Sequence, residues 1–440
     1  MESRPVQVSF SEAVWVWLKI GCLGFGGPAG QIALMHRVLV DEKKWVEESR
    51  YLHALNFCML LPGPEAQKLA TYVGWLLHGV RGGLAAGILF VLPGALVMLA
   101  VSLLYVLGSG IPVVDGALFG IKAAVLVIVV EALLRIGRRS LKTALLVWLA
   151  GLAFVGIFFF DLPFPLIVAA AAAVGFAVTQ SSPGLLGLKA GETHAGKPEP
   201  GRWRQAVLVS VVGLALWWAP VLLAVVLLGA QHVLVDIGLF FSKLAVVSFG
   251  GAYALLSYMA QQAVETHGWM TAPEMVDGLG LAETLPGPLI KVTQFVGFLG
   301  AYRAAEPLTP LASAVLGSAL ATWVTFTPPM LLIFACAPFV EQLRANQRLS
   351  GALAAITAAV VGVILNLTLW FVLHVLFADI REMHAGPLRW YAFDPLAIDL
   401  KAAGLALVAA VLAFRFHRGL IQMVAIMAAL GIAVRLLLGA

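Results

Sequence analysis

Long apolar segments separated by short polar loops run along the whole chain. An apolar run of about 20 residues is long enough to cross a bilayer as a helix. Because backbone groups in lipid must bond within their own segment, runs of this length predict helices rather than barrel strands. The segments are 10–36, 52–79, 84–107, 113–135, 141–160, 162–180, 205–229, 235–260, 275–301, 309–338, 349–377, 396–416 and 419–439.

Composition agrees with a membrane protein. Hydrophobic residues make up 61% of the chain and charged residues only 12%, against roughly 25% charged in a soluble domain. A net charge of +5 without a basic stripe predicts cytoplasmic loops rich in lysine and arginine, and no nucleic-acid partner. We therefore expect an all-α polytopic membrane protein in contact with lipid.

Catalytic and metal-binding patterns are missing from the sequence. The three cysteines, Cys22, Cys58 and Cys336, are scattered, which fits neither a disulfide framework nor a metal site. No nucleophile elbow or zinc-binding histidine pair is present. We expect no metal, no cofactor and no enzymatic activity.

The chain repeats itself at an offset of 224 residues, which becomes 223 after one deletion. Fixed-offset similarity of this kind indicates an internal duplication. The first copy is expected at 1–180 and the second at 235–440, with a Gly- and Pro-rich linker and one extra helix at 181–234. The matched pairs are Lys19 and Lys243, Gly26-Gly27 and Gly250-Gly251, Met35 and Met259, Trp45 and Trp269, Pro62-Gly63-Pro64 and Pro286-Gly287-Pro288, and Lys68 and Lys291.

Loop charges predict that the two copies are inverted. The basic loops 135–142 and 181–204 belong on the cytoplasmic side. The loops 108–115, 160–165 and 229–238 have no lysine or arginine and belong on the other side. The extra crossing at 205–229 then inverts the second copy, with the N-terminus inside and the C-terminus outside.

Two topologies satisfy these charges. Loop 36–50 is basic, and its counterpart 260–274 has no lysine or arginine. The first loop lies inside if segments 10–36 and 52–79 are re-entrant, and outside if both span. The sequence leaves open about nine spans with four broken hairpins, or thirteen spans.

Each Pro-Gly-Pro breaks an apolar segment, because proline removes a helical hydrogen bond and clashes with the preceding turn. In lipid, such a break survives only where protein or a wet cavity surrounds it. The half-helix after each break starts with free N–H groups at its positive end, and Lys68 or Lys291 follows within one turn. Gly26-Gly27 and Gly250-Gly251 supply a second break in each copy and let a bound group approach the backbone. We expect an anion site at these breaks, typical of secondary transporters with inverted repeats.

Less specific alternatives apply to each candidate residue. A single Pro-Gly-Pro is typical of a packing kink. Because the motif recurs in the repeat with a lysine after it each time, this alternative is disfavoured. Lys19 and Lys243 either snorkel to an interface or line the pathway. Glu65 and Glu283 flank the breaks and either carry a coupling proton or neutralise a lysine.

At these residues the chain resembles the chromate ion transporter family in its long, two-domain form. The motifs are "GFGGPAGQIALM" (24–35), "LLPGPEAQKLATYVGWLLHGVRGG" (60–83), "SFGGAYALL" (248–256) and "AETLPGPL" (282–289). The resemblance implies a bacterial inner-membrane protein that exports chromate, driven by the membrane potential or a proton gradient, and so confers resistance. It also implies that the Phe-Gly-Gly and Pro-Gly-Pro residues frame the site.

The second copy departs from the first, since Leu289 stands at the position of Glu65 and Ala252 at that of Pro28. The site is therefore not expected to be strictly symmetric. Sulfate has the shape and charge of chromate, so another anion remains an alternative substrate. The sequence leaves open whether the chain forms a homodimer.

Overall fold

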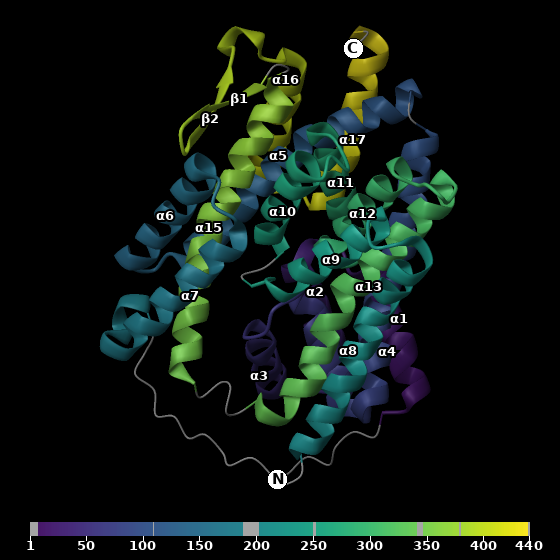
Figure 1. Cartoon of the computed structure of the whole chain (residues 1–440), viewed down its shortest axis with the longest axis vertical. Helices are drawn as coiled ribbons and strands as arrows, with labels where there is room; N and C mark the ends of the chain where they lie inside the picture. The colour runs from purple at the N-terminus through teal and green to yellow at the C-terminus, as the bar shows by residue number, and fades with distance from the viewer. Residues whose placement is uncertain are drawn as a thin grey trace. The chain divides into compact units, whose positions relative to one another are not determined.

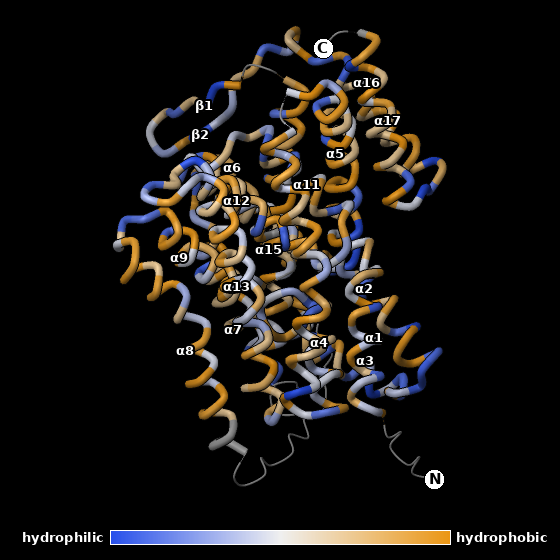
Figure 2. The backbone as a smooth tube through the Cα atoms, turned by 90° about the vertical axis from the view of Figure 1, so that its right-hand side faces the viewer, coloured by the Kyte–Doolittle hydropathy of each residue, from blue (hydrophilic) through white to orange (hydrophobic). Residues whose placement is uncertain are grey.

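A computed structural model of the chain describes residues 8–108, 110–187, 202–249, 252–340, 346–377 and 380–438. Nearly all of this backbone is helical (Figure 1), which confirms the all-α class. Apolar residues run along the whole length of the long helices (Figure 2). Seven described helices are long and apolar enough to cross a membrane. They are α4 (Glu65–Leu107), α5 (Pro112–Ser140), α7 (Phe164–Ser181), α8 (Arg202–Leu228), α13 (Pro310–Cys336), α15 (Gln347–Leu376) and α17 (Leu420–Leu438).

The outer faces of these helices are apolar, as lipid contact requires. On α8, Leu208, Val226 and Leu227 are each at least 64% exposed. In a water-soluble protein, contiguous exposure of such residues is rare. The chain is therefore a multi-pass membrane protein.

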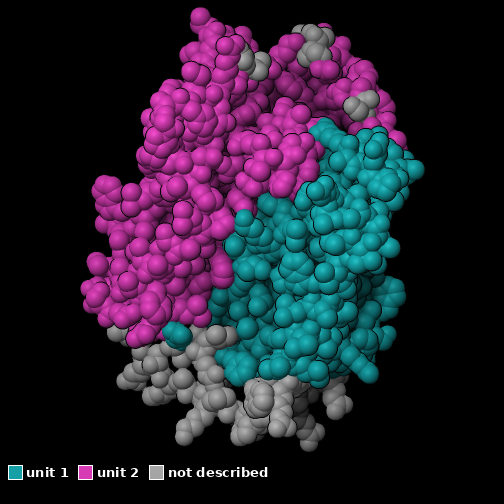
Figure 3. Space-filling view, viewed as in Figure 1, with its two compact units in different colours: residues 1–100, 193–248, 285–346 teal, residues 101–192, 249–284, 347–440 magenta. Residues whose placement is uncertain are grey.

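The chain forms two compact units, each assembled from separate stretches of sequence (Figure 3). Unit 1 contains residues 1–100, 193–248 and 285–346, and unit 2 contains 101–192, 249–284 and 347–440. Each unit takes stretches from both halves of the chain. This division by packing is different from the division by sequence repeat.

Unit 1 contains several helices that are too short to cross a bilayer. They are α1 (Phe10–Leu23), α2 (Gly27–His36), η1 (Arg37–Glu42), α3 (Glu48–Met59), α9 (Val233–Val246), η4 (Leu289–Lys291) and α12 (Val292–Arg303). The long helices α4, α8 and α13, followed by η5 (Ala337–Phe339), complete the unit. At 1.5 Å per residue, a half-helix of 10 to 14 residues covers about 15–21 Å, against about 30 Å of hydrocarbon.

The first two apolar segments fold back on themselves in unit 1. Lys43, after η1, forms an ion pair of 2.7 Å with Glu12 at the start of α1. His78, where α4 is kinked, bonds to the Val8 carbonyl at 2.8 Å. Both returning ends therefore lie beside the start of the chain. These contacts favour the re-entrant topology for 10–36 and 52–79.

Unit 2 packs a set of long helices around one short hairpin of helices. Its shorter elements are α6 (Ala144–Phe160), η2 (Pro183–Leu186), α10 (Ala252–Gln261), η3 (Gln262–Thr266), α11 (Ala272–Thr284), η6 (Pro395–Ala397), α16 (Leu400–Ala410) and η7 (Val411–Arg415). α15 lies against α6 and α7, and α11 lies against α5. Gln261, at the end of α10, bonds to Asp161 after α6. The α10–α11 connection thus lies at the same end of unit 2 as loop 160–165, as the re-entrant topology requires.

A β-hairpin that the sequence analysis did not predict joins α15 to α16. Strands β1 (Ile380–Ala385) and β2 (Leu388–Phe393) pair antiparallel, with Ile380 opposite Phe393 and Ala385 opposite Leu388. The hairpin was missed because its strands are short and the surrounding apolar runs dominate the pattern. It brings Arg389 into the interior of unit 2.

Candidate functional site

The two Pro-Gly-Pro motifs form tight irregular turns between half-helices. Gly63 has φ +105° and Gly287 has φ +94°, a backbone conformation that a side chain disfavours. α4 begins at Glu65, directly after the first motif, and η4 and α12 follow the second. The residues after each motif therefore start a new helical segment with unpaired N–H groups.

The two breaks are joined by reciprocal hydrogen bonds within unit 1. The Gly63 N–H donates to the Ser248 carbonyl at 2.9 Å, and the Gly287 N–H donates to the Gly24 carbonyl at 3.0 Å. Gly63 and Gly287 are equivalent in the repeat, and so are Gly24 and Ser248. Each Pro-Gly-Pro is thus bonded to the residue just before the Phe-Gly-Gly break of the other copy, a reciprocity typical of a two-fold relation. We call each of these two contacts a crossing.

Each Pro-Gly-Pro also packs against the middle of a long helix from the other copy. A Cβ on Gly63 would lie 2.5 Å from the side chain of Pro329 in α13. A Cβ on Gly94 in α4 would lie 2.3 Å from the Pro286 carbonyl oxygen. Both contacts lie beside prolines inside the long helices, Pro328-Pro329 in α13 and Pro93 in α4. Glycine is required at both positions because a Cβ would collide with the Pro329 ring or with the Pro286 carbonyl.

Lys68 and Lys291 are fully buried beside the two breaks. The Lys68 ammonium donates to the Leu61 carbonyl. The Lys291 ammonium donates to the carbonyls of Leu285 at 3.0 Å and Gly287 at 3.2 Å. Each lysine thus reaches back to carbonyls at the negative end of the preceding half-helix, a favourable position for a cation. Glu65, the first residue of α4, also interacts electrostatically with the Lys68 ammonium.

Glutamine side chains add hydrogen bonds near the breaks, and none of them was among the predicted site residues. Gln31 in α2 donates to the carbonyls of Gly24 at 3.0 Å and Gly287 at 2.7 Å. Gln31 and Lys291 therefore share the Gly287 carbonyl. The equivalent position in the second copy is Leu255, so only one of the two crossings has this amide. The predicted asymmetry of the site thus extends beyond the Glu65 and Pro28 positions.

Two more glutamines bond to the long helices near the prolines that lie inside them. Gln67 in α4 donates to the Phe326 carbonyl at 3.0 Å, and Gln294 in α12 donates to the Ala95 carbonyl at 2.8 Å. The side-chain oxygens of Gln67, Gln294 and Gln31 are buried without a hydrogen-bond partner among the described residues. A buried polar atom of this kind normally finds a partner in water or ligand. The region around the breaks therefore has hydrogen-bond acceptors that a water molecule or a donor on a ligand could satisfy.

The other predicted glycine and lysine candidates are less buried than the Pro-Gly-Pro glycines. Gly26 and Gly27 have φ +84° and +66° at the start of α2. Lys19 in α1 and Lys243 in α9 are exposed. Gly250 and Gly251 lie outside the described residues.

The two predicted carboxylates differ in their surroundings. Glu65 is the first residue of α4 and is half-buried. Glu283, near the end of α11 in unit 2, is buried and accepts a 2.7 Å hydrogen bond from the Tyr253 hydroxyl. For Lys68 and Lys291, the hydrogen bonds described above go to carbonyls rather than to these carboxylates.

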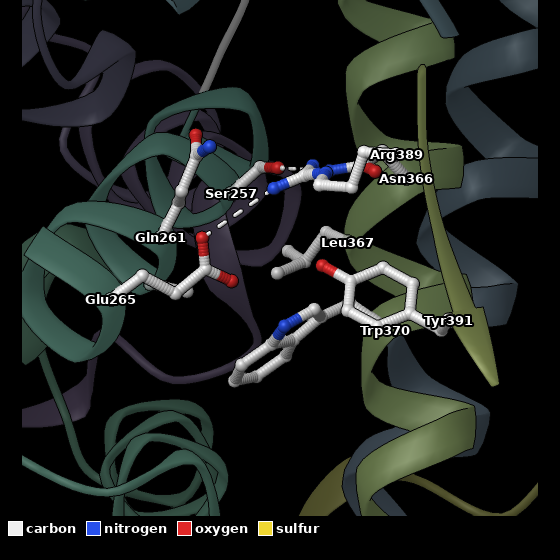
Figure 4. A pocket seen from close by; sticks show the side chains of 9 residues that line it. Ser257, Gln261, Glu265, Asn366, Leu367, Trp370, Arg389 and Tyr391 are labelled. Carbon is white, nitrogen blue, oxygen red and sulfur yellow. Dashed lines mark hydrogen bonds and ion pairs between the residues drawn. The ribbon is translucent and has the colours of Figure 1, made fainter. Parts of the chain in front are cut away.

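A second polar cluster lies in unit 2 around Arg389 (Figure 4). Arg389 is only 3% exposed, and its Nη1 lies 3.0 Å from Asp161, 3.5 Å from Glu382 and 3.6 Å from Glu265. Its other nitrogens donate to the carbonyls of Ile157 and Phe158 at the end of α6. One guanidinium thus ties β1, η3 and α6 together at the hairpin end of the unit.

This cluster has an excess of negative charge. Burial raises the pKa of Glu265 to about 7, assisted by Glu382 and Asp161 and opposed by Arg389. Ser257, Gln261, Asn366 and Trp370 line the small pocket beside it. No group of three His, Cys, Asp or Glu side chains suited to a metal ion occurs among the described residues.

Comparison with known proteins identifies the family. The chromate transporter family model matches residues 11–176 and 235–433. The chain belongs to the chromate transporter family. Members of the chromate transporter family are transporters and not enzymes, so the chain is a transporter.

Two curated relatives of this chromate transporter family member cover about four-fifths of its length, and a shorter one covers less than half. The chromate transport protein of Pseudomonas aeruginosa is 33% identical over 377 residues, 82% of this chain and 81% of the relative. The probable chromate transport protein of Synechococcus elongatus is 30% identical over 358 residues, 81% of this chain and 83% of the relative. An uncharacterized transporter of Bacillus subtilis, YwrB, is 28% identical over 187 residues, covering 42% of this chain and 84% of its own length. No solved structure matches the chain.

Gln31 and Arg389 of this chromate transporter family member were not predicted as site residues, for different reasons. Gln31 lies in the "GFGGPAGQIALM" motif and was a detectable polar residue in an apolar segment. Arg389 lies in a polar loop, where arginine is ordinarily solvated, and no sequence signal marks it as buried. Only the folding of the β-hairpin against α6 reveals it.

Proposed function

We propose that this chain is a secondary active transporter that exports chromate, or a related oxyanion, across the bacterial inner membrane. Two relatives that align with more than four-fifths of the chain are named chromate transport proteins or probable ones. The observation that carries the proposal is the pair of reciprocal hydrogen bonds in unit 1 that join each Pro-Gly-Pro break to the other copy, with a buried lysine beside each break.

The two crossings offer the positive charge and the hydrogen-bond donors that a dianion needs. Chromate loses its hydration on entering the membrane, which is costly unless hydrogen bonds and opposite charge replace it. The starts of the half-helices offer N–H groups at their positive ends, and Lys68 and Lys291 add two charges. Both ammonium groups donate to carbonyls, and these dipoles orient the lysines without cancelling their charge.

Broken helices also suit alternating access. Both breaks sit between short half-helices, and the reciprocal bonds from Gly63 to Ser248 and from Gly287 to Gly24 link the two copies. Transporters with inverted repeats bind their substrate where such discontinuous helices meet near the midplane. We place the anion of this transporter at the same position, between the breaks.

The proposed orientation has the N-terminus in the cytoplasm and the C-terminus in the periplasm. The basic loop 135–142 supports it through the positive-inside rule. The ion pair of Lys43 with Glu12 supports re-entry of the first segments, which assigns the basic loop 36–50 to the cytoplasmic side as well. A reporter after Ala440 should appear in the periplasm and one in loop 181–204 in the cytoplasm. Finding both on one side would exclude inversion.

A direct transport assay tests the proposal. Everted membrane vesicles that contain the protein should accumulate labelled chromate when energised, and a protonophore should abolish the accumulation. Vesicles without the protein are the control. Absence of chromate accumulation by vesicles with correctly inserted protein would contradict the proposal.

Another anion such as sulfate is the alternative substrate, because it is also a tetrahedral dianion. Competition between labelled chromate and unlabelled sulfate in the same vesicles separates the two. Stronger inhibition of chromate uptake by sulfate than by unlabelled chromate would make sulfate the preferred substrate.

A further inference from the structure

Asp277 is a buried carboxylate in the re-entrant half-helix α11 of unit 2. It is 3% exposed. Its Oδ2 lies 3.2 Å from the Lys122 ammonium of α5 and accepts a 2.9 Å hydrogen bond from the Tyr105 hydroxyl at the end of α4. Its other oxygen, Oδ1, is buried with no hydrogen-bond partner among the described residues. Neither the predicted site nor the proposed anion site contains it.

This arrangement is costly for a carboxylate that never changes its charge. A buried ion pair repays its desolvation only when further hydrogen bonds satisfy the remaining lone pairs, and Oδ1 lacks one. A proton on Oδ1 would remove the buried negative charge. Ionisable residues inside the membrane typically belong to ion or proton pathways.

The surroundings of Asp277 leave Lys122 as its one close cation among the described residues. Glu274, one turn earlier in α11, caps the helix start by accepting from Thr271. Other ionisable groups on the helices packed against α11 have partners of their own. Glu131 and Arg135 of α5 pair with each other. Asp115 of α5 pairs with Arg435 of α17, and His374 of α15 lies over Trp370.

The position of Asp277 along α11 connects it with one end of unit 2. α11 begins at Ala272, just after the connection that the Arg389 cluster holds beside loop 160–165. Asp277 is five residues further, about 7–8 Å along the axis, and Glu283 is about 9 Å beyond it. Asp277 thus lies between the hairpin end of the unit and the buried Glu283.

We propose that Asp277 is a proton-binding site, and that this proton is the ion exchanged for the exported anion. The proton bonds to a carboxylate oxygen of Asp277, and Lys122 then loses its ionised partner. Loss of the proton restores the pair. This inference rests on the proposed function, because it names the coupling ion of the same transporter. Glu283 is the next carboxylate that the proton would reach.

The test uses the full-length protein in liposomes that contain a pH-sensitive dye. A chromate gradient imposed on wild-type protein should drive a measurable proton flux in the opposite direction. Asp277→Asn should reduce this proton flux by at least about tenfold, as expected when a proton-carrying group is removed. Exchange of labelled for unlabelled chromate, which needs no net proton movement, should remain. Asp277→Glu keeps the carboxyl group and should retain more of the flux.

Asp115→Asn is the matched control. It removes a carboxylate of α5 that is paired with Arg435, and it should leave the proton flux intact. If Asp277→Asn fails to fold, Asp277→Asn combined with Lys122→Gln removes both charges of the pair and leaves no unpaired cation. A folded variant of either kind with wild-type proton flux would overturn the proposal.

The same assay separates the two proposals. Chromate exchange by wild-type protein without any coupled proton flux would overturn the proton site and leave the proposed function standing. No movement of chromate in either assay would contradict the proposed function itself.

Discussion

The two compact units bury charge in opposite ways. Among the described residues, the fully buried charges of unit 1 are Lys68 and Lys291, and their ammonium groups donate to carbonyls. Unit 2 buries Asp277, Glu283 and Arg389, and each of these contacts side chains. A carbonyl dipole orients a cation without cancelling its charge, whereas an opposite charge cancels it. Unit 1 thus buries cations suited to attracting an anion, and unit 2 contains groups suited to gaining or losing a proton.

The units also differ in how they hold their irregular segments. In unit 1 the breaks are held by direct contact of one backbone with another, at Gly63, Gly94 and Gly287. In unit 2 the re-entrant connection is held by the side chain of Arg389 and its carboxylates. Backbone contacts are insensitive to pH, while carboxylate contacts respond to it. The following substitutions test this difference, starting with the largest expected effect.

Replacing Arg389 with Gln should destabilise unit 2 strongly. The change leaves Asp161, Glu265 and Glu382 close together without their cation. Breaking one side of a buried pair costs about 3–5 kcal/mol, and we expect the lower end because the carboxylates are partly exposed. Arg381→Gln on the exposed face of β1 is the control. Thermal unfolding in detergent measures both, and equal stability of the two variants would contradict a structural role for the Arg389 cluster.

Replacing Lys68 or Lys291 with Gln should weaken chromate binding without a comparable loss of stability. Removing one buried charge from a dianion site costs a few kcal/mol at a modest dielectric, hence a tenfold or greater rise in Kd. Arg at either position should retain more affinity than Gln, and Lys142→Gln in an exposed loop should have no effect. Binding to folded, purified protein is the measurement. Wild-type affinity in both Gln variants would show that the lysines only stabilise the breaks.

Replacing Gly63 with Ala should destabilise unit 1 through packing. The new Cβ would lie 2.5 Å from Pro329, and overpacking together with the positive φ should cost about 2 kcal/mol or more. Gly386→Ala in the β-hairpin is a matched control, since Gly386 also has positive φ but nothing lies within 4 Å of its Cβ position. The Gly386→Ala variant should lose only the roughly 1 kcal/mol of stability that backbone strain costs. Equal losses in the two variants would argue against close packing at the crossing.

Unit 2 should lose stability as the pH rises toward neutrality, because of Glu265. The pKa of Glu265 is about 7 in the folded chain, against its ordinary value of 4.5. Between these values the folded state binds a proton that the unfolded state does not, so stability falls with rising pH by at most about 1.4 kcal/mol per pH unit. Glu265→Gln should flatten this dependence, and Glu382→Gln should keep it. Unfolding measured from pH 4.5 to 8 checks the slope, and an unchanged slope in Glu265→Gln would assign it to another group.

Some of the candidate site was predictable because it depends on local chemistry. Pro62 and Pro64 cannot continue a helix, and a lysine one turn later is placed beside the break by helical spacing alone. The same reasoning does not distinguish Lys19 and Lys243 from Lys68 and Lys291, since all four recur in the repeat. Burial separates them: the first two are exposed and the last two fully buried. Burial depends on which helices pack together, and a single sequence carries no direct record of that.

The membrane class, the helical backbone and the positions of the breaks follow from the amino-acid order, because apolar length, proline and glycine act on residues close to them in the chain. The bonds of Gly63 to Ser248 and of Gly287 to Gly24, and the burial of Arg389 and Asp277 among charged partners, depend on the packing of the helices. These contacts join residues far apart in the chain, such as Arg389 and Asp161. Their energies come from desolvation and close approach, which exist only after the helices have packed.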